Sequence, residues 1–241
     1  AFCIGTNQID VLEAQKKGIA VFNAPYSNTR SVVELVIAEI ILLMRNLLNK
    51  VPQMHEGVWN KTATNSFEIR GKTLGIIGYG NIGSQLSIIA EAMGMKVIYY
   101  DLVEKLGLGN ASPCESMDEL ISKSDVITIH VDGRTENDHL IDEKEFELMK
   151  DGVIFLNLSR GHVVNYAALR KAILSGKVGG TGVDVFPLEP MSNADEFVSE
   201  LRGLPNTLLT PHLGGSTLEA QKNIANFVPS RIMDYINTGS T

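Results

Sequence analysis

An apolar run that leads directly into three closely spaced glycines constrains the fold of this chain more than any other feature. Residues 74–77 are apolar, Gly78, Gly80 and Gly83 follow, and a helical pattern of apolar residues begins at once. In such a turn the first glycine permits a tight change of direction, the second lets the backbone approach a pyrophosphate, and the third lets the helix pack closely on the sheet. Because a helix N-terminus favours negative charge, the pattern predicts a dinucleotide site.

An acidic residue at the end of the next apolar run supports this interpretation. Asp101 follows the run 96–100 and lies 21 residues after Gly80 (101 − 80), close to the spacing of about 20 that is typical of the acid on the adenosine ribose. Asp101 would accept hydrogen bonds from the ribose hydroxyls and repel a 2′-phosphate, and no arginine follows it directly. We therefore predict NAD rather than NADP. The alternative is an aspartate that only caps a helix.

The composition bounds the class of protein. Of the 241 residues, 44% are hydrophobic, which suits a globular protein with a sizeable core. A formal net charge of −7 argues against a nucleic-acid partner, and an anionic substrate would need a local cationic pocket. Cys3 and Cys114 form no CxxC pair, and neither they nor the five histidines show metal-ligand spacing. We therefore predict no metal and a reduced, cytoplasmic setting.

The most apolar segment, residues 32–48, contains Glu34, Glu39 and Arg45. Charges at the centre of a membrane span are costly, so we predict a buried or interface helix and no membrane partner. Its apolar positions wrap most of the circumference, which leaves a core helix and an oligomer interface as equal alternatives. Thr29 is a plausible N-cap for this helix.

From Lys72 onward, apolar strands alternate with helical patterns. Continuous apolar strands between helices are typical of a parallel sheet covered on both faces, so the predicted fold class is α/β with a doubly wound, Rossmann-type sheet. The predicted strands are 74–77, 96–100, 125–130, 152–157, 179–185 and 207–210. The predicted helices between them are 81–93, 116–122, 142–149 and 165–174. Elsewhere we predict a short helix at 9–15, a strand at 19–22, an irregular arm at 51–70 and a helix at 217–236.

Three chemically active residue types follow the last three predicted strands. They are Arg160, Glu189 and His212, in that order, and ligands bind at the carboxyl ends of strands in such sheets. An arginine can hold a carboxylate, a histidine can shuttle a hydroxyl proton near neutral pH, and a glutamate can orient that histidine. Together they suit oxidation of an alcohol beside a carboxylate, with a nicotinamide carrying the hydride. Asp184 could accept a hydrogen bond from the nicotinamide amide. Taken singly, Arg160, Glu189 or His212 could each be an ordinary surface residue.

Several stretches resemble the D-isomer-specific 2-hydroxyacid dehydrogenase family. The family's motifs correspond to residues 78–83, 157–161, 184–190 and 210–217. Further stretches at 4–10, 23–32 and 57–61 are similar to the branch of the family that acts on 3-phospho-D-glycerate. The resemblance covers the whole chain. It implies NAD-dependent oxidation of 3-phosphoglycerate, a small anionic substrate, to 3-phosphohydroxypyruvate, the first step of L-serine biosynthesis.

The resemblance also implies roles for individual residues. Arg160, Glu189 and His212 fall on the family's catalytic positions. The implied cofactor-binding residues are Gly78, Gly80, Asn81, Ile82, Gly83, Asp101, Leu158, Ser159, Arg160, Asp184, His212, Leu213, Gly214 and Gly215. Leu158 stands where a smaller residue is common in the family. We expect this departure to be tolerated, since the contacts there are largely through the backbone.

The domain organisation follows from the same resemblance. We assign residues 28–214 to the NAD-binding domain, and residues 1–27 and 215–241 to remnants of a discontinuous, smaller substrate domain. The chain begins inside an apolar run without an initiator methionine, and residues 237–241 resemble the start of a linker. We therefore expect a fragment that lacks the upstream substrate domain and any C-terminal regulatory domain.

The resemblance implies a homodimer or homotetramer, with helix 32–48 and Trp59 in the subunit contact and Lys61 near the neighbouring active site. Two alternatives to the 3-phosphoglycerate activity stay open. One is a dehydrogenase of another small D-2-hydroxy acid, such as glycerate or lactate. The other is a non-catalytic, NAD-sensing protein, because some transcriptional corepressors share this fold and retain similar residues.

Overall fold

The computed structural model describes residues 1–6 and 9–239. Asn7 and Gln8, which fall in one of the stretches that carry the resemblance, lie outside the described residues, as do Ser240 and Thr241 of the predicted linker. The chain divides into two compact units. We call residues 33–212 the sheet unit, and residues 1–32 with 213–241 the terminal unit.

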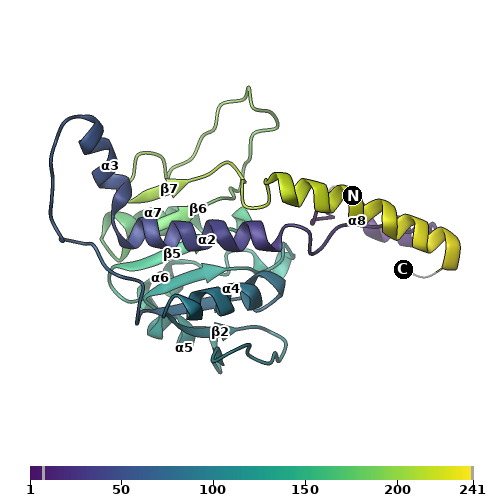
Figure 1. The fold of residues 1–241 in the computed structure, drawn as a ribbon, viewed down its shortest axis with the longest axis horizontal. Helices are drawn as coiled ribbons and strands as arrows, with labels where there is room; N and C mark the ends of the chain where they lie inside the picture. Colours follow the sequence, from purple (N-terminus) through teal and green to yellow (C-terminus); the bar gives the residue numbers. More distant parts are fainter. Residues whose placement is uncertain (7–8, 240–241) are drawn as a thin grey trace. The chain divides into compact units, whose positions relative to one another are not determined.

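A parallel sheet forms the centre of the sheet unit (Figure 1). Its strands are β1 (Thr73–Ile77), β2 (Lys96–Tyr100), β3 (Ser112–Pro113), β4 (Val126–Ile129), β5 (Val153–Asn157), β6 (Val178–Val183) and β7 (Thr207–Leu209). Across the described ranges the order is β3-β2-β1-β4-β5-β6-β7, and every neighbouring pair is parallel. The order reverses beside β1, which places the switch point of the sheet at the carboxyl end of that strand. The predicted α/β, doubly wound class is confirmed.

The helices that belong wholly or mainly to the sheet unit are α2 (Thr29–Met44), α3 (Leu47–His55), α4 (Asn81–Ala92), α5 (Met117–Lys123), α6 (Glu143–Leu148) and α7 (Tyr166–Leu174). Two short 3₁₀ turns, η1 (Thr135–Asn137) and η2 (Gly161–Val163), follow β4 and β5. The predicted strands and helices from Lys72 to β7 agree with these bounds to within two residues. The strand β3 was not predicted, because two paired residues are too short to produce a hydrophobic pattern.

Helices α2 and α4 cover the same face of the sheet (Figure 1). A row of registered neighbours across β4 and β5 joins Ile76 of β1 to Gly182 of β6, so both residues face the same side. Gly83 of α4 packs against Ile76, and Glu39 of α2 packs against Gly182. The absence of side chains at Gly182 and Gly83 therefore allows both helices to approach the sheet closely.

The opposite face holds the largest cluster of buried apolar side chains. Gly75 precedes Ile76 and so points to this other side, where it faces Leu120 of α5. The cluster combines side chains of α5, α6 and α7 with those of the central strands, including Ile127, Ile129, Phe146, Phe155, Leu169 and Val183. This packing fixes the carboxyl ends of β4, β5 and β6 at one edge.

Four local predictions outside the sheet were wrong. Residues 19–22 form no regular strand. Thr29 begins α2 itself instead of capping it, and the single helix predicted for 32–48 ends at Met44. Asn46 adopts a left-handed conformation (φ +52°) that few residue types tolerate, and α3 then extends to His55, into the segment predicted to be irregular.

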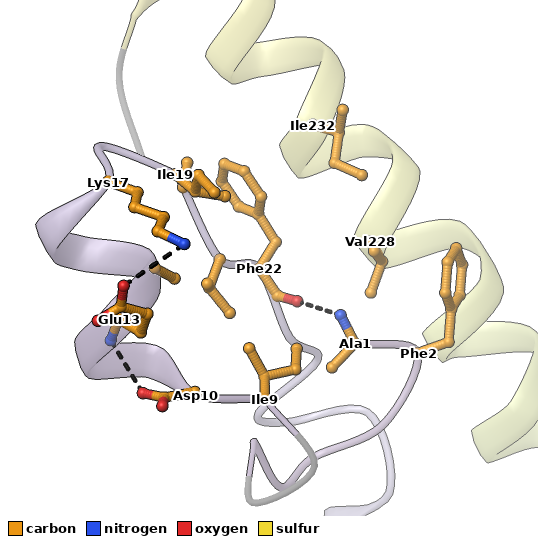
Figure 2. A pocket seen from close by; sticks show the side chains of 13 residues that line it. Ala1, Phe2, Ile9, Asp10, Glu13, Lys17, Ile19, Phe22, Val228 and Ile232 are labelled. Atoms are coloured by element: carbon orange, nitrogen blue, oxygen red, sulfur yellow. Dashed lines mark hydrogen bonds and ion pairs between the residues drawn. The ribbon is translucent and has the colours of Figure 1, made fainter.

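The terminal unit contains α1 (Val11–Lys16) and α8 (Leu218–Thr238). The rings of Phe22 and Tyr235 pack with centroids 5.5 Å apart. Figure 2 shows a pocket of about 500 Å³ in this unit, lined by apolar side chains that include Ile9, Ile19, Phe22, Val228 and Ile232. None of the predicted site residues lines it.

The described helices are all too short or too polar to cross a membrane. Among the described residues, no group of three or more histidine, cysteine or acidic side chains is arranged to hold a metal ion.

Candidate active site

The glycine turn joins β1 to α4. Gly78 has φ +91°, and a Cβ there would lie 2.6 Å from the carbonyl oxygen of His130. A Cβ on Gly83 would lie 2.4 Å from the carbonyl oxygen of Gly78. Since both distances are impossible for a real Cβ, only glycine fits at either position. The tight turn and the close helix packing expected from the sequence are therefore present.

Gly80 lies at the open side of this turn. A Cβ at Gly80 would meet nothing within 4 Å, so the glycine here leaves space in front of the backbone. Gly80 is the N-cap of α4 and makes no side-chain capping bond, and Asn81 and Ile82 form the first helical positions. The unpaired N–H groups of this first turn are thus available to an anion.

Asp101 lies beside the glycine turn. One carboxylate oxygen accepts the backbone N–H of Tyr79 at 2.8 Å, and the other accepts the N–H of Val103 at 3.0 Å. Asp101 therefore contacts the glycine turn directly, because Tyr79 lies between Gly78 and Gly80. The acid and the glycine turn share one edge of the sheet.

Asn157 organises the segment that follows β5. Its side chain is fully buried, and its Oδ1 atom accepts both the N–H and the hydroxyl of Ser159, at 3.1 and 2.8 Å. Its Nδ2 atom donates to the carbonyl oxygen of Arg160 at 3.0 Å. Leu158 and Ser159 are buried, whereas Arg160 is half-buried and donates from one guanidinium nitrogen to the Ser159 carbonyl at 2.7 Å. The backbone of the predicted arginine is therefore held in place.

Asp184 is buried just beyond β6. Its Oδ1 atom accepts the Thr210 hydroxyl at 2.6 Å, and its carbonyl accepts the N–H of His212 at 2.9 Å. Glu39 of α2 is also fully buried, and its two carboxylate oxygens have no hydrogen-bond partner among the described residues. Burial, together with the charge of Asp184, raises the pKa of the Glu39 carboxyl from 4.5 to about 8. Glu39 is therefore neutral at pH 7.

Glu189 and His212 are brought together. The Nδ1 atom of His212 lies 2.9 Å from Oε2 of Glu189, and Oε1 of Glu189 accepts the N–H of Phe186 at 3.1 Å. His212 has φ +53°, a conformation that is uncommon for a histidine. Its N–H is bonded to the carbonyl groups of Asp184 and Thr210, which supports this backbone geometry. The side chain of His212 remains half exposed and accessible to a ligand.

His130, at the end of β4, is a second histidine at this edge. Its Nε2 atom lies 3.0 Å from the Thr128 hydroxyl, and Nδ1 is buried without a hydrogen-bond partner among the described residues. Burial lowers the pKa of His130 from 6.5 to about 3. His130 is therefore neutral throughout the physiological range and is poorly suited to proton transfer.

The remaining predicted contacts, Leu213, Gly214 and Gly215, belong to the terminal unit. Leu213 accepts the N–H of Ser216 through its carbonyl at 2.8 Å. A Cβ on Gly215 would lie 2.3 Å from the side-chain nitrogen of Asn28, so a larger residue there would have to displace the Asn28 side chain.

Comparison with known proteins decides the family. The model of the D-isomer specific 2-hydroxyacid dehydrogenase NAD binding domain matches residues 37–214. The chain belongs to the D-isomer specific 2-hydroxyacid dehydrogenase family. Its sheet unit carries the NAD binding domain of that family, which agrees with the cofactor predicted from the glycine turn and Asp101.

Curated members of the family are similar over the whole chain. D-3-phosphoglycerate dehydrogenase of Haemophilus influenzae is 53% identical over 240 residues, which cover all of this chain and 58% of that protein. The enzymes of the same name from Escherichia coli K12 and Dictyostelium discoideum are each 51% identical over 240 residues and are covered over 58% and 59% of their lengths. The chain thus spans somewhat more than half the length of these relatives.

Solved dehydrogenase structures have the same fold at lower identity. The NAD-dependent formate dehydrogenase of Staphylococcus aureus in complex with NAD is 30% identical, with a TM-score of 0.88 over 100% of this chain and 72% of that one. D-lactate dehydrogenase of Lactobacillus jensenii with NAD⁺ is 28% identical, with a TM-score of 0.87 over 98% of this chain and 74% of that one.

Some residues at this edge were not identified from the sequence as part of a site. Asn157 belongs to one of the stretches that resemble the family, and a polar residue at the end of an apolar strand is itself a signal of a site. Glu39 is a lone acid in an apolar helix, which is the signal that the sequence offers for it. Tyr166 lies beside Asn157 because of how α7 packs, and no local pattern in the sequence indicates this contact.

Proposed function

We propose that the protein carrying this chain oxidises 3-phospho-D-glycerate to 3-phosphohydroxypyruvate with NAD, the first step of L-serine biosynthesis. The observation that carries the proposal is the bonded pair of His212 and Glu189 at the carboxyl edge of an NAD binding domain. The identity of 50–53% to curated D-3-phosphoglycerate dehydrogenases over the whole chain supports the choice of substrate.

The residues around the glycine turn fit a dinucleotide. We assign the pyrophosphate to the open backbone at Gly80 and the first turn of α4, where no side-chain cap competes. We assign the adenosine ribose to Asp101, and the nicotinamide end to the Ser159–Arg160 segment, Asp184 and the 212–215 stretch. When bound, NAD supplies the hydride acceptor.

His212 is proposed as the acid and base of the reaction. Because Nδ1 is bonded to Glu189, Nε2 is the nitrogen left to accept the proton of the substrate hydroxyl during oxidation, or to return it during reduction. The carboxylate of Glu189 stabilises the imidazolium that forms, and its second bond to the Phe186 N–H holds its orientation. These contacts preorganise the proton transfer before substrate binds.

Arg160 is proposed to hold the substrate carboxylate. A guanidinium offers a planar fork of donors to a carboxylate, and it can also polarise the neighbouring carbonyl. One guanidinium nitrogen donates to the adjacent Ser159 carbonyl, and a guanidinium has further N–H donors that a ligand could accept. The backbone of Arg160 is fixed by Asn157, which limits reorganisation on binding.

The wider organisation belongs to the same proposal. Residues 28–214 would form the NAD-binding domain, with residues 1–27 and 215–241 contributing to a substrate domain. A cytoplasmic homodimer or homotetramer is proposed as the working form, without a nucleic-acid or membrane partner. Trp59, which is 77% exposed, supports a subunit contact because a tryptophan this exposed leaves a large apolar surface in water.

A substrate panel tests the proposal. The rate of NADH oxidation would be measured with 3-phosphohydroxypyruvate, hydroxypyruvate, pyruvate and glyoxylate on one preparation of the full-length protein that carries this chain. We expect the highest kcat/KM with 3-phosphohydroxypyruvate. Preference for an unphosphorylated acid would assign the protein to another small D-2-hydroxy acid. Binding of NADH without turnover of any acid would support a non-catalytic NAD sensor.

A further inference from the structure

One buried hydroxyl bridges the two backbone segments that carry Arg160 and Glu189. Tyr166, the first residue of α7, is 5% exposed. Its hydroxyl accepts a hydrogen bond from Nδ2 of Asn157 at 3.3 Å and donates one to the carbonyl oxygen of Val185. The residues on either side of this hydroxyl belong to different strand ends, since Asn157 closes β5 and Val185 follows β6.

On the first side, the bridge reaches the arginine segment through Asn157. The same Nδ2 atom that donates to Tyr166 also donates to the carbonyl of Arg160 at 3.0 Å. Both hydrogens of this amide are therefore used, and its oxygen is occupied by Ser159. Because this amide is fully buried and all its hydrogen bonds are made, another conformation of the segment would leave buried polar groups unpaired.

On the second side, the bridge reaches the glutamate. The residue after Val185 is Phe186, whose N–H holds Oε1 of Glu189 at 3.1 Å while Oε2 lies against His212. The ring of Tyr166 also packs edge-on against the ring of Phe186, with centroids 6.3 Å apart. Tyr166 thus contacts the peptide that positions the proposed acid–base pair.

The two segments also touch through their backbones. A Cβ on Gly161 would lie 2.0 Å from the carbonyl carbon of Phe186 and 2.4 Å from the nitrogen of Pro187. The residue after Arg160 must therefore be glycine for the segments to approach this closely. This contact is independent of the hydroxyl bridge and indicates the same close approach.

We propose that Tyr166 is a positioning residue that fixes the Arg160 segment relative to the Glu189–His212 pair. The inference rests on the proposed function, in which Arg160 and His212 act on the same substrate. Arg160 would bind the carboxylate while His212 exchanges a proton with the oxygen on the adjacent carbon, so their separation must match the substrate. A misplacement of about 1 Å in such an arrangement costs about 100-fold in rate.

The first test is Tyr166→Phe, which keeps the ring on Phe186 and removes only the hydroxyl. The control is Thr181→Val, which removes a buried hydroxyl that bonds across the same two strands, to the Phe155 carbonyl at 2.9 Å, but inside the sheet. We expect kcat with 3-phosphohydroxypyruvate to fall about 10- to 100-fold in Tyr166→Phe, with an unchanged Kd for NADH. An equal kcat in the two variants would overturn the proposal.

The second test forces the segments apart without removing a hydrogen bond. Gly161→Ala inserts a methyl group between residue 161 and the Phe186 carbonyl, so we expect the same loss of kcat with NADH still bound. Normal kcat in a folded Gly161→Ala variant would contradict the positioning role.

A third measurement does not depend on turnover. The amide hydrogens of Ser159 and Phe186 are bonded within the two bridged segments, so their exchange with solvent should speed up in Tyr166→Phe and not in Thr181→Val. Unchanged exchange in Tyr166→Phe would overturn the inference. Failure of the wild-type protein to reduce any 2-oxo acid would instead refute the proposed function, while the exchange result would still decide the bridge.

Discussion

The Nδ1 atom of His212 lies 2.9 Å from Oε2 of Glu189. The other oxygen of this carboxylate is held by the Phe186 N–H, so its orientation is set by the backbone. The pair therefore combines a partly exposed imidazole with a carboxylate of fixed orientation. The predictions on Glu189 and His212 follow from this geometry.

Glu189→Gln should move the pH dependence of reduction to lower pH. The amide keeps the shape of the side chain but no longer offers a negative charge to protonated His212, and reduction requires that proton. The measurement is kcat/KM for 3-phosphohydroxypyruvate between pH 5 and 9. Glu196→Gln, in an exposed glutamate of the same loop, is the control. A pH profile that stays in place would refute the functional pairing of Glu189 with His212.

Asp101→Ala should narrow the preference for NADH over NADPH. The substitution removes the proposed ribose hydrogen bonds, each worth about 1.5–3 kcal/mol when one partner is charged, and it removes repulsion of the 2′-phosphate. The Kd for NADH should therefore rise about 10- to 100-fold. The Kd for NADPH should rise less than this or stay unchanged. Fluorescence titration of the 241-residue chain measures both.

The control for this experiment is Glu104→Ala, which removes an exposed acid three residues further on (104 − 101). Equal binding of NADH and NADPH by the unmodified chain would show that Asp101 does not select the cofactor.

Glu39→Gln should remove a loss of stability that develops as the pH rises from 4.5 to about 8. The pKa of Glu39 is raised from 4.5 to about 8 in the folded state, so the folded chain keeps a proton that the unfolded chain releases. Stability attributable to this group is complete below pH 4.5 and falls as the pH rises towards 8, by about 1.4 kcal/mol per pH unit within that window. The glutamine variant cannot ionise and should lose none.

Urea unfolding at several pH values between 5 and 8 measures this difference. Glu34→Gln, on the exposed side of the same helix, is the matched control and should follow the wild-type curve. If Glu39→Gln and the wild type had parallel pH dependence, Glu39 would not be the buried neutral acid described here.

The centre of the fold could be predicted because local patterns determine it. The β1–α4–β2 unit combines an apolar strand, three glycines with distinct steric roles and an acid at the next strand end, and the structure places Asp101 in contact with that turn. The break at Asn46 was not predicted, because an apolar pattern continues through it and only the backbone conformation shows the change. The two-residue strand β3 is determined by pairing with β2, which leaves no local signal.

The candidate site was predicted in part for the same reason. Parallel strands bring their carboxyl ends to one edge, so residues after β5, β6 and β7 could be grouped from the sequence. The bridge from Tyr166 to Val185 depends on the packing of α7 against β6, and the buried state of Glu39 depends on its position opposite Gly182. Both are tertiary relationships between residues distant in sequence.

The steady-state kinetics of His212→Asn test the central claim most directly. Asparagine can still hydrogen-bond but cannot transfer a proton near neutral pH. The control is His55→Asn, at the C-terminal end of α3. In the full-length enzyme with saturating NADH and 3-phosphohydroxypyruvate, the account predicts that kcat falls about 10²- to 10⁴-fold while the Kd for NADH changes little. Retention of wild-type kcat, or a loss of NADH affinity as large as the loss of kcat, would contradict it.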